Sequence, residues 1–326
     1  MEKILLGTIG SGTIVHNFLD CVKQTEGIEL YAVYSRAAEK AGALAREYAA
    51  KKTYTDMEAF LSDEAFNFVY VATPNSLHYQ QAKAALEHGK NVIVEKPFCV
   101  HAWQVQALQD LAKEKGLFLI DATPTAFLPN LKLLRENLKK IGPVRLSLSN
   151  YTQYSSRYTK LLQGELTNIF DPAFAGGCLS DINYYNIYLN VALFGRPDEV
   201  RYYANLYPGA ADTSGIAVLR YPGFVSQCTG SKDSHGISQV DIEGEKGFVQ
   251  VAGGSNGLKS VRVVCGDEDV TLNGQSEPNR WLYEVRNMTR LILDDGREEL
   301  DKNLDITLTV IETLERARDD AGIEFA

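Results

Sequence analysis

The chain has 326 residues, of which 45% are hydrophobic and 23% charged, a composition typical of a folded globular protein of two domains. Its formal net charge is −9, which disfavours binding to the phosphate backbone of nucleic acid. The apolar run after Met1 is too short for a signal peptide, and no run of about 18 apolar residues predicts a membrane span.

The first 120 or so residues alternate between short apolar runs and longer helical patterns. Continuous apolar runs of this kind are typical of parallel strands buried on both faces, with helices as the crossovers. We therefore predict a doubly wound parallel sheet, an N-terminal Rossmann domain, over residues 1–122. The predicted strands are residues 4–9, 28–34, 66–72, 91–94 and 117–121, and the predicted helices are residues 12–25, 37–49, 77–88 and 102–115.

The pattern changes after about Thr123. Several apolar and Tyr/Val/Thr-rich runs, separated by turn residues and without helices between them, predict a mostly antiparallel sheet. We assign residues 123–326 to a second, α+β domain and expect its closing helix, residues 303–320, to pack back on the first domain. The predicted strands are residues 144–151, 200–206, 214–221, 224–230, 239–243, 247–251 and 260–264, with two more helices at residues 128–140 and 176–193.

A glycine-rich turn joins the first predicted strand to the first predicted helix, and the segment from Gly7 to Val15 reads GTIGSGTIV. Gly10 permits a tight turn, and Gly12 lets the backbone approach a pyrophosphate at the helix N-terminus. Val15 stands where a third small residue is usual, and the alternative is an ordinary strand-to-helix turn. The residues expected to contact a dinucleotide here are Gly7, Gly10, Gly12, Thr13 and Ile14.

The end of the second predicted strand bears on the choice of nicotinamide cofactor. NAD sites often place an acidic residue there, to hold the ribose 2′-hydroxyl. This chain has Ser35 and Arg36 instead, and a guanidinium can bind a 2′-phosphate. We therefore favour NADP over NAD, the alternative being that Arg36 is a solvated surface charge.

Two further segments follow predicted strands, at the edge where open α/β sheets bind ligands. The segment after the third strand contains candidate cofactor contacts, although the same residues also suit a helix start. Glu95 and Lys96 follow the fourth strand, and Pro97 biases Lys96 away from helix; the alternative is a solvated surface pair. The candidate cofactor contacts in these two segments are Thr73, Pro74, Asn75, His78, Glu95 and Lys96.

The order and spacing of these motifs resemble the Gfo/Idh/MocA family of oxidoreductases. The resemblance extends to the segment GGCLSDINYY from Gly176 and to AGIEF near the end of the chain. It implies a Rossmann domain, an open-faced sheet domain that binds substrate and often oligomerises, and NAD(P)-dependent chemistry on sugars or related alcohols and carbonyls.

One departure from the family pattern lies in the second domain. Many members carry Asp-x-x-x-His, whereas here Asp181 is followed by Tyr185. Tyrosine at that position resembles the branch of glucose-fructose oxidoreductase, dimeric dihydrodiol dehydrogenase and some xylose dehydrogenases. Asn183 also replaces a usual glycine. The alternative interpretation of Tyr185 is a core aromatic residue on an amphipathic helix.

The resemblance implies a catalytic set of Lys96, Tyr185 and Asp181, with no metal. Lys96 and Tyr185 would take the hydroxyl proton and stabilise the developing alkoxide, while Asp181 would orient the substrate or Lys96. The expected substrate is a sugar, a polyol or a dihydrodiol. Two alternatives stay open: a catalytically silent NADP-binding regulatory protein, and a family reductase that acts on imines or tetrapyrroles. Candidate pocket residues are Arg157, Tyr158, Asn168, Asp171 and Asn186.

The partners and location follow from the same observations. We expect a small polar substrate, no nucleic acid, no membrane and a homodimer or homotetramer. The five cysteines are scattered, without a CxxC pair or a Cys/His cluster, so we expect reduced thiols in a cytoplasmic protein.

Overall fold

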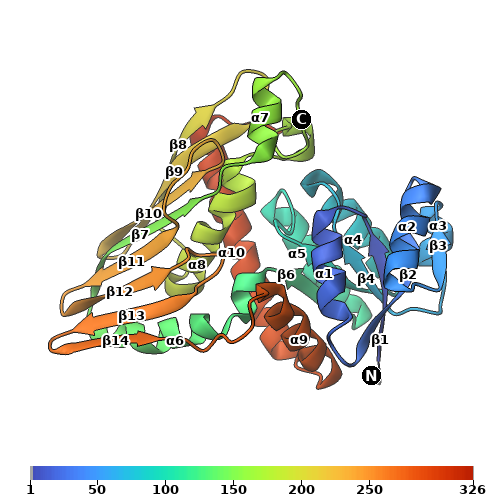
Figure 1. Cartoon of the computed structure of the whole chain (residues 1–326), viewed down its shortest axis with the longest axis horizontal. Helices are drawn as coiled ribbons and strands as arrows, with labels where there is room; N and C mark the ends of the chain where they lie inside the picture. The colour runs from blue at the N-terminus through green and yellow to red at the C-terminus, as the bar shows by residue number, and fades with distance from the viewer. Residues whose placement is uncertain (1–2, 326) are drawn as a thin grey trace. The chain divides into compact units, whose positions relative to one another are not determined.

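The computed structural model describes residues 3–325, which form two compact units. The first unit extends to Pro124 and includes Asn279–Thr307, and the second comprises Thr125–Pro278 and the residues from Leu308 onward. Each unit contains one sheet (Figure 1). Between residues 3 and 325, no helix is both long enough and apolar enough to cross a membrane.

The sheet of the first unit has six strands in the order β3-β2-β1-β4-β5-β6, and every pair is parallel. This order and direction define a Rossmann fold, as predicted. The strands are β1 (Ile4–Ile9), β2 (Ile28–Tyr34), β3 (Lys52–Tyr54), β4 (Phe68–Val71), β5 (Asn91–Glu95) and β6 (Leu119–Ala122). The helices are α1 (Thr13–Val22), α2 (Ala38–Tyr48), α3 (Met57–Leu61), α4 (His78–Glu87), α5 (Ala102–Lys115) and α9 (Arg280–Leu293), with a 3-10 turn at Asn75–Leu77.

Three elements of this unit were not expected from the sequence. Strand β3 has only three residues, two of them exposed, and α3 has five, so neither shows a usable periodicity. Helix α9 packs on α1 through an apolar face that includes Leu282, Val285 and Met288. The segment 279–307 therefore belongs to the first unit, whereas the sequence pattern predicts it in the second domain.

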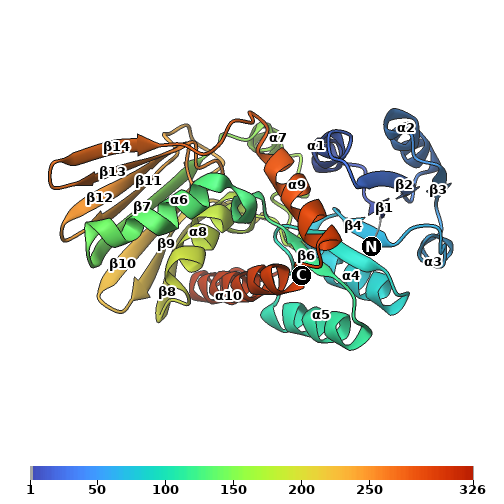
Figure 2. The ribbon, with the colours of Figure 1, turned by 90° about the horizontal axis from the view of Figure 1, so that it is seen from below.

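The sheet of the second unit has eight strands in the order β14-β13-β12-β11-β7-β10-β9-β8. Only β7 and β10 pair in parallel, which confirms the mostly antiparallel sheet. Helices α6 and α8 pack against one face of it (Figure 2). The strands are β7 (Val144–Thr152), β8 (Glu199–Leu206), β9 (Asp212–Tyr221), β10 (Phe224–Ser231), β11 (Gln239–Gly244), β12 (Gly247–Ala252), β13 (Ser260–Cys265) and β14 (Glu268–Leu272). The helices are α6 (Pro129–Leu138), α7 (Ser156–Leu162) and α8 (Tyr184–Phe194), with a π-helical segment at Leu179–Asn183 and 3-10 turns at Pro124–Phe127, Lys139–Ile141 and Pro172–Phe174.

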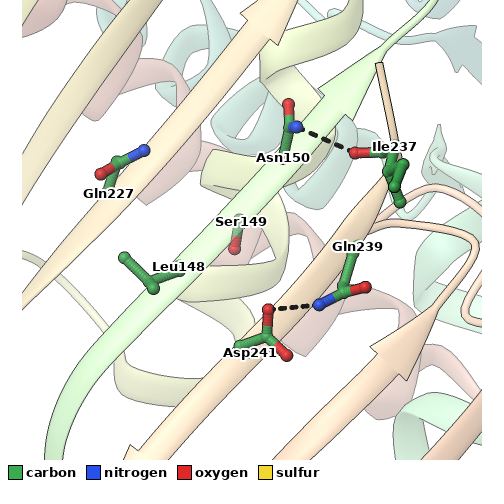
Figure 3. A pocket seen from close by; sticks show the side chains of 7 residues that line it. All are labelled: Leu148, Ser149, Asn150, Gln227, Ile237, Gln239 and Asp241. Atoms are coloured by element: carbon green, nitrogen blue, oxygen red, sulfur yellow. Dashed lines mark hydrogen bonds between the residues drawn. The ribbon is translucent and has the colours of Figure 1, made fainter.

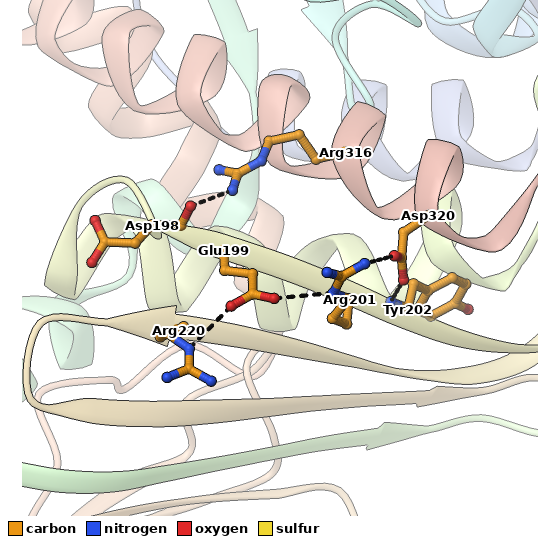
Figure 4. A network of polar contacts seen from close by, with 7 residues as sticks. All are labelled: Asp198, Glu199, Arg201, Tyr202, Arg220, Arg316 and Asp320. Carbon is orange, nitrogen blue, oxygen red and sulfur yellow. Dashed lines mark hydrogen bonds and ion pairs between the residues drawn. The ribbon is translucent and has the colours of Figure 1, made fainter.

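The last helix, α10 (Arg297–Ala321), contributes to both units, because the boundary falls between Thr307 and Leu308. In the second unit, Asp320 pairs with Arg201 at 2.6 Å and accepts the backbone N–H of Tyr202 at 2.8 Å (Figure 4). These contacts hold the C-terminal half of α10 to the edge strand β8. Only the part of α10 up to Thr307 therefore belongs to the first unit, whereas the sequence predicts that residues 303–320 pack on it.

Candidate functional site

The turn between β1 and α1 is shaped by Gly10. Its φ of +123° is unfavourable for other residues, and a Cβ there would lie 2.3 Å from the carbonyl oxygen of Ala72, just after β4. The chain itself therefore requires glycine at this position. Val15, the departure from the usual motif, is fully buried within the first turn of α1.

Gly12 is different, because nothing in its own conformation requires a glycine. It is the N-cap of α1, with a φ of −84°, and a Cβ added to it would meet no described atom within 4 Å. No described side chain caps the helix and its first turn has no acidic residue, so the N–H groups of Thr13 and Ile14 have no side-chain acceptor among residues 3–325. This end of α1 can accept an anionic group.

Gly7 has a packing role that the motif did not predict. It lies inside β1, where a Cβ would come within 2.7 Å of the rings of Phe60 and Phe66. These aromatic side chains account for the glycine, so its expected contact with a dinucleotide stays a prediction.

The end of β2 presents an exposed arginine. The Ser35 N–H donates to the carbonyl oxygen of Tyr54 at 3.1 Å, which fixes the strand end beside β3. The next residue, Arg36, is exposed and makes no hydrogen bond or ion pair with any residue from 3 to 325. Its guanidinium is thus available to an external anion.

The register of three strands places the glycine turn and Lys96 at one edge of the sheet. Ile9 pairs with Val71, and Val71 pairs with Val94. The residues that follow, Gly10 and Glu95, therefore lie about two strand spacings apart, roughly 10 Å. Lys96, which is half-buried, comes directly after Glu95.

His78 bridges the loops that follow β4 and β5. Its ring nitrogens lie 2.9 Å from the carbonyl oxygen of Thr73 and 3.0 Å from that of Pro97. Burial lowers the pKa of His78, and the nearby charge of Lys96 acts in the same direction. The ring therefore braces the loop that carries Lys96, and a direct contact with the cofactor stays a prediction. The hydroxyl of Thr73 donates to Gln81 at 2.7 Å.

Glu95 is buried beneath this edge with a second carboxyl nearby that the sequence did not reveal. Burial raises the pKa of Glu95 to about 7, although hydrogen bonding from Tyr70 and the charge of Lys96 oppose the shift. Glu284 of α9 is fully buried, and neither of its oxygens has a hydrogen-bond partner among the described residues. Burial, with the charges of Glu95 and Asp121, raises the pKa of Glu284 well above its usual range.

In the second unit, the segment that carries Asp181 begins with a pair of glycines that pack closely. A Cβ on Gly176 would lie 2.6 Å from the carbonyl oxygen of Asn168, and one on Gly177 would lie 2.2 Å from Oδ1 of Asp212. Asp212 accepts the N–H of Leu179 at 2.8 Å and the hydroxyl of Tyr202 at 2.6 Å. Burial raises the pKa of Asp212 to about 6. This unpredicted carboxyl caps the start of the helical segment.

Asp181 lies in a π-helical turn, Leu179–Asn183, where we had expected regular α-helix. Such turns insert an extra residue and are frequent at functional sites. Its carboxylate forms an ion pair with the ammonium of Lys232, a residue that the sequence analysis did not single out. Lys232 follows β10 and carried no motif that marked it.

Tyr185 is 4% exposed, on a helix whose other residues are largely core. Its ring packs edge-on against Tyr151, with centroids 5.8 Å apart. Asn183 and Asn186 donate to the carbonyl oxygens of Cys228 and Thr229, at 3.0 and 2.8 Å. These amides attach the helix to β10. Asn183, where a glycine is usual, is accommodated because Gly230 faces it.

The candidate pocket residues are dispersed. Asn186 is fully buried, and Asp171 caps a 3-10 turn by accepting the N–H of Ala173 at 2.9 Å. A shallow hollow of about 250 Å³ lies instead on the sheet, and Asn150 there donates to the carbonyl oxygen of Ile237 at 2.8 Å (Figure 3). It is lined by Leu148, Ser149, Asn150, Gln227, Ile237, Gln239 and Asp241.

The fold and the glycine turn are those of a dinucleotide-binding protein, and comparisons with known proteins identify an oxidoreductase. Residues 4–122 match the model of the oxidoreductase family with an NAD-binding Rossmann fold, and residues 135–250 match the GFO/IDH/MocA C-terminal domain. The chain belongs to the Gfo/Idh/MocA family of oxidoreductases, as its motifs suggested.

Individual relatives cover three quarters or more of the chain. It is 34% identical over 325 residues to the NADP(+)-dependent scyllo-inositol 2-dehydrogenase IolU of Bacillus subtilis, covering 99% of this chain and 98% of that protein. It is 27% identical to the trans-1,2-dihydrobenzene-1,2-diol dehydrogenase of Sus scrofa, over 75% of this chain and 73% of that one. A 3-ketoreductase of Actinomadura kijaniata, solved with NADP and TDP-benzene, has the same fold, with a TM-score of 0.85, 20% identity and 98% coverage of both chains.

Proposed function

We propose that this chain transfers a hydride between NADP and a CH–OH carbon of a polyol, a sugar or a dihydrodiol. The observation that carries the proposal is the register of β1, β4 and β5, which puts Lys96 at the same sheet edge as the Gly10–Gly12 turn. A half-buried amine there is well placed to act on a substrate beside a dinucleotide.

The residues of the first unit fit the cofactor. The uncapped N-terminus of α1 would hold the pyrophosphate, with the backbone at Gly12 in close approach. The exposed and unpaired guanidinium of Arg36 would hold a 2′-phosphate, which supports NADP over NAD. When bound, the nicotinamide supplies the hydride donor or acceptor.

The catalytic groups of the chain would handle the proton and the charge. We assign Lys96 and Tyr185 to one substrate oxygen: Lys96 takes the hydroxyl proton and its ammonium then stabilises the oxygen, while Tyr185 shares or relays that proton. Asp181 orients the substrate. His78 and Glu95 act on Lys96 indirectly, because the first braces its loop and the second accepts its N–H at 3.1 Å.

The relatives support the substrate class. The names of the bacterial and pig enzymes give a polyol and a dihydrodiol as substrates, and both molecules carry adjacent hydroxyl groups. We therefore place cyclic polyols first among candidate substrates. The direct test is a screen of inositols, aldoses and trans-dihydrodiols with NADP+ and NAD+, followed by absorbance of the reduced nicotinamide. A protein that binds NADPH but reduces NADP+ with no member of the screen would contradict the proposal.

We also propose a homo-oligomer that forms through the second unit, in the cytoplasm. Apolar side chains stand exposed on the sheet face opposite α6 and α8, among them Tyr203 at 70% and Ile216 at 39% exposure. Such a surface favours contact with a second copy. The free thiols of Cys21, Cys99, Cys178, Cys228 and Cys265 support a reducing compartment.

A further inference from the structure

Lys232 is a buried lysine, and its partner is Asp181, the carboxylate that we propose orients the substrate. The residue is 5% exposed, and its ammonium pairs with Oδ2 of Asp181, whose side chain is 23% exposed. An ammonium removed from water is strongly unfavourable without a partner, so the two charges depend on one another. The exposed part of the pair is the carboxylate.

The turn that carries Lys232 is fixed from both sides. Its N–H donates to the carbonyl oxygen of Thr213 at 2.9 Å, and its own carbonyl oxygen accepts the N–H of Ser155 at 2.9 Å. The next residue, Asp233, accepts the hydroxyls of Thr213 at 2.7 Å and of Ser231 at 2.8 Å. The ammonium is therefore held in place before any ligand arrives, which is the property of a preorganised site.

Carboxylates outnumber the ammonium of Lys232 around Cys178. The groups that act on the buried thiol of Cys178 include three carboxylates, Asp212, Asp181 and Asp233, and the ammonium of Lys232. The ammonium of Lys232 offsets part of the negative charge that these carboxylates bring together. Lys232 thus compensates the charge of Asp181 within the ion pair.

We propose that Lys232 is a positioning residue of the substrate site. It fixes Asp181 so that this carboxylate accepts a hydroxyl adjacent to the reacting carbon. The pair thereby selects uncharged substrates with vicinal hydroxyls. The inference rests on the proposed function and deepens it. A carboxylate paired with an ammonium is a hydrogen-bond acceptor without net charge, so it suits a neutral hydroxyl and gives no advantage to an anion.

The test compares Lys232→Met, Lys232→Arg and Asp181→Asn with wild type, using scyllo-inositol and trans-1,2-cyclohexanediol as vicinal diols and cyclohexanol as the mono-alcohol. The control is Lys140→Met, which removes an exposed lysine paired with Glu268 in the same unit. We expect Lys232→Met to lower kcat/KM for the diols about 10- to 100-fold, mainly through KM, and Lys232→Arg to recover most of it. The NADPH dissociation constant should stay within about twofold.

The pH profile separates positioning from a structural role. Asp212 of β9 and Asp233, which follows Lys232, act together with Asp181 on the thiol of Cys178, and both are acidic, so neither can replace the ammonium. In Lys232→Met the acid limb of kcat/KM should therefore move up by about one pH unit or more. If that variant does not fold, Lys232→Met/Asp181→Asn, which leaves no unpaired member of the ion pair, should fold and show the same loss for diols.

The outcomes are distinguishable. A wild type that oxidises no polyol overturns the proposed function, and this inference with it. If the wild type is active, either of two results overturns the positioning role alone. In the first, Lys232→Met retains kcat/KM within threefold. In the second, it loses kcat/KM equally for the diols and for cyclohexanol, and the pH profile does not shift.

Discussion

The hydroxyl of Tyr70 donates a 2.6 Å hydrogen bond to Oε1 of Glu95, beneath the sheet edge that carries Lys96. Tyr70 is itself stacked on Phe18 at a centroid distance of 4.0 Å, so the donor is held in the core. A carboxyl that is buried and yet bonded to a neutral donor retains its proton to higher pH than an exposed one.

This environment predicts a pH-dependent contribution to stability. The pKa of Glu95 is raised to about 7 in the folded state, so folding binds its proton more tightly. Its contribution is complete below the unfolded-state pKa, near 4.5, and is lost as the pH rises through about 7. Wild type should lose up to about 3 kcal/mol relative to Glu95→Gln across that window. Urea unfolding of both proteins at several pH values measures the difference, and a difference independent of pH would contradict the assignment.

We predict that Gly12 affects cofactor binding directly, because it would contact the dinucleotide, and that Gly10 affects it indirectly, because the fold of the turn requires glycine there. Gly12→Val should weaken NADPH binding at least about tenfold while the melting temperature holds, because the added atoms meet only the pyrophosphate. Gly10→Ala should instead lower the melting temperature, since its Cβ meets the carbonyl oxygen of Ala72. Fluorescence titration with NADPH and thermal unfolding check both; wild-type affinity in Gly12→Val would show that the turn binds no dinucleotide.

The preference for NADP is predicted to reside in Arg36. Removing the guanidinium in Arg36→Ala should raise the dissociation constant of NADPH about 10- to 100-fold and that of NADH by much less. The matched control is Arg46→Ala, which removes a different exposed arginine that lies in α2. Equal losses for the two cofactors would refute a role in reading the 2′-phosphate.

Lys96 and Tyr185 are predicted to act as a unit. Lys96→Ala and Tyr185→Phe should each lower the rate of hydride transfer about 100-fold or more, and the double variant should be little worse than the poorer single one. Tyr221→Phe is the control, because Tyr221 is buried and its hydroxyl has no partner in the described structure. Single-turnover measurements with an identified substrate decide the matter. Full activity in Tyr185→Phe would make Tyr185 a core aromatic residue, with Asp181 or His78 next to test.

The exposed sheet face is predicted to form the contact between copies of the chain. Ile216→Glu should shift the protein toward monomer, because a charge would be buried beside Tyr203, the strand partner of Ile216, in that contact. Leu162→Glu places the same charge on α7, where Leu162 is 55% exposed, and should leave the assembly unchanged. Light scattering at micromolar concentration measures both, and a monomeric wild type would rule out this interface.

The sequence by itself determined the order of the elements and the parts of the site that lie within short motifs. Runs such as residues 4–9 and 28–34 agree with β1 and β2 residue for residue, because buried parallel strands are continuously apolar. The family followed from several short motifs whose order and spacing can be read directly from the sequence. Short or surface elements such as β3 gave no periodic signal, and the π-helical turn at Asp181 has no pattern of its own.

Only the tertiary structure decided which distant residues meet. Lys232 lies 51 residues from Asp181, and Glu284 comes from a helix near the end of the chain to a cluster with Glu95 and Asp121. A lone lysine or glutamate in a sequence is indistinguishable from a solvated surface charge. Its role becomes visible when folding removes it from water, because a buried charge must then find a partner or keep its proton.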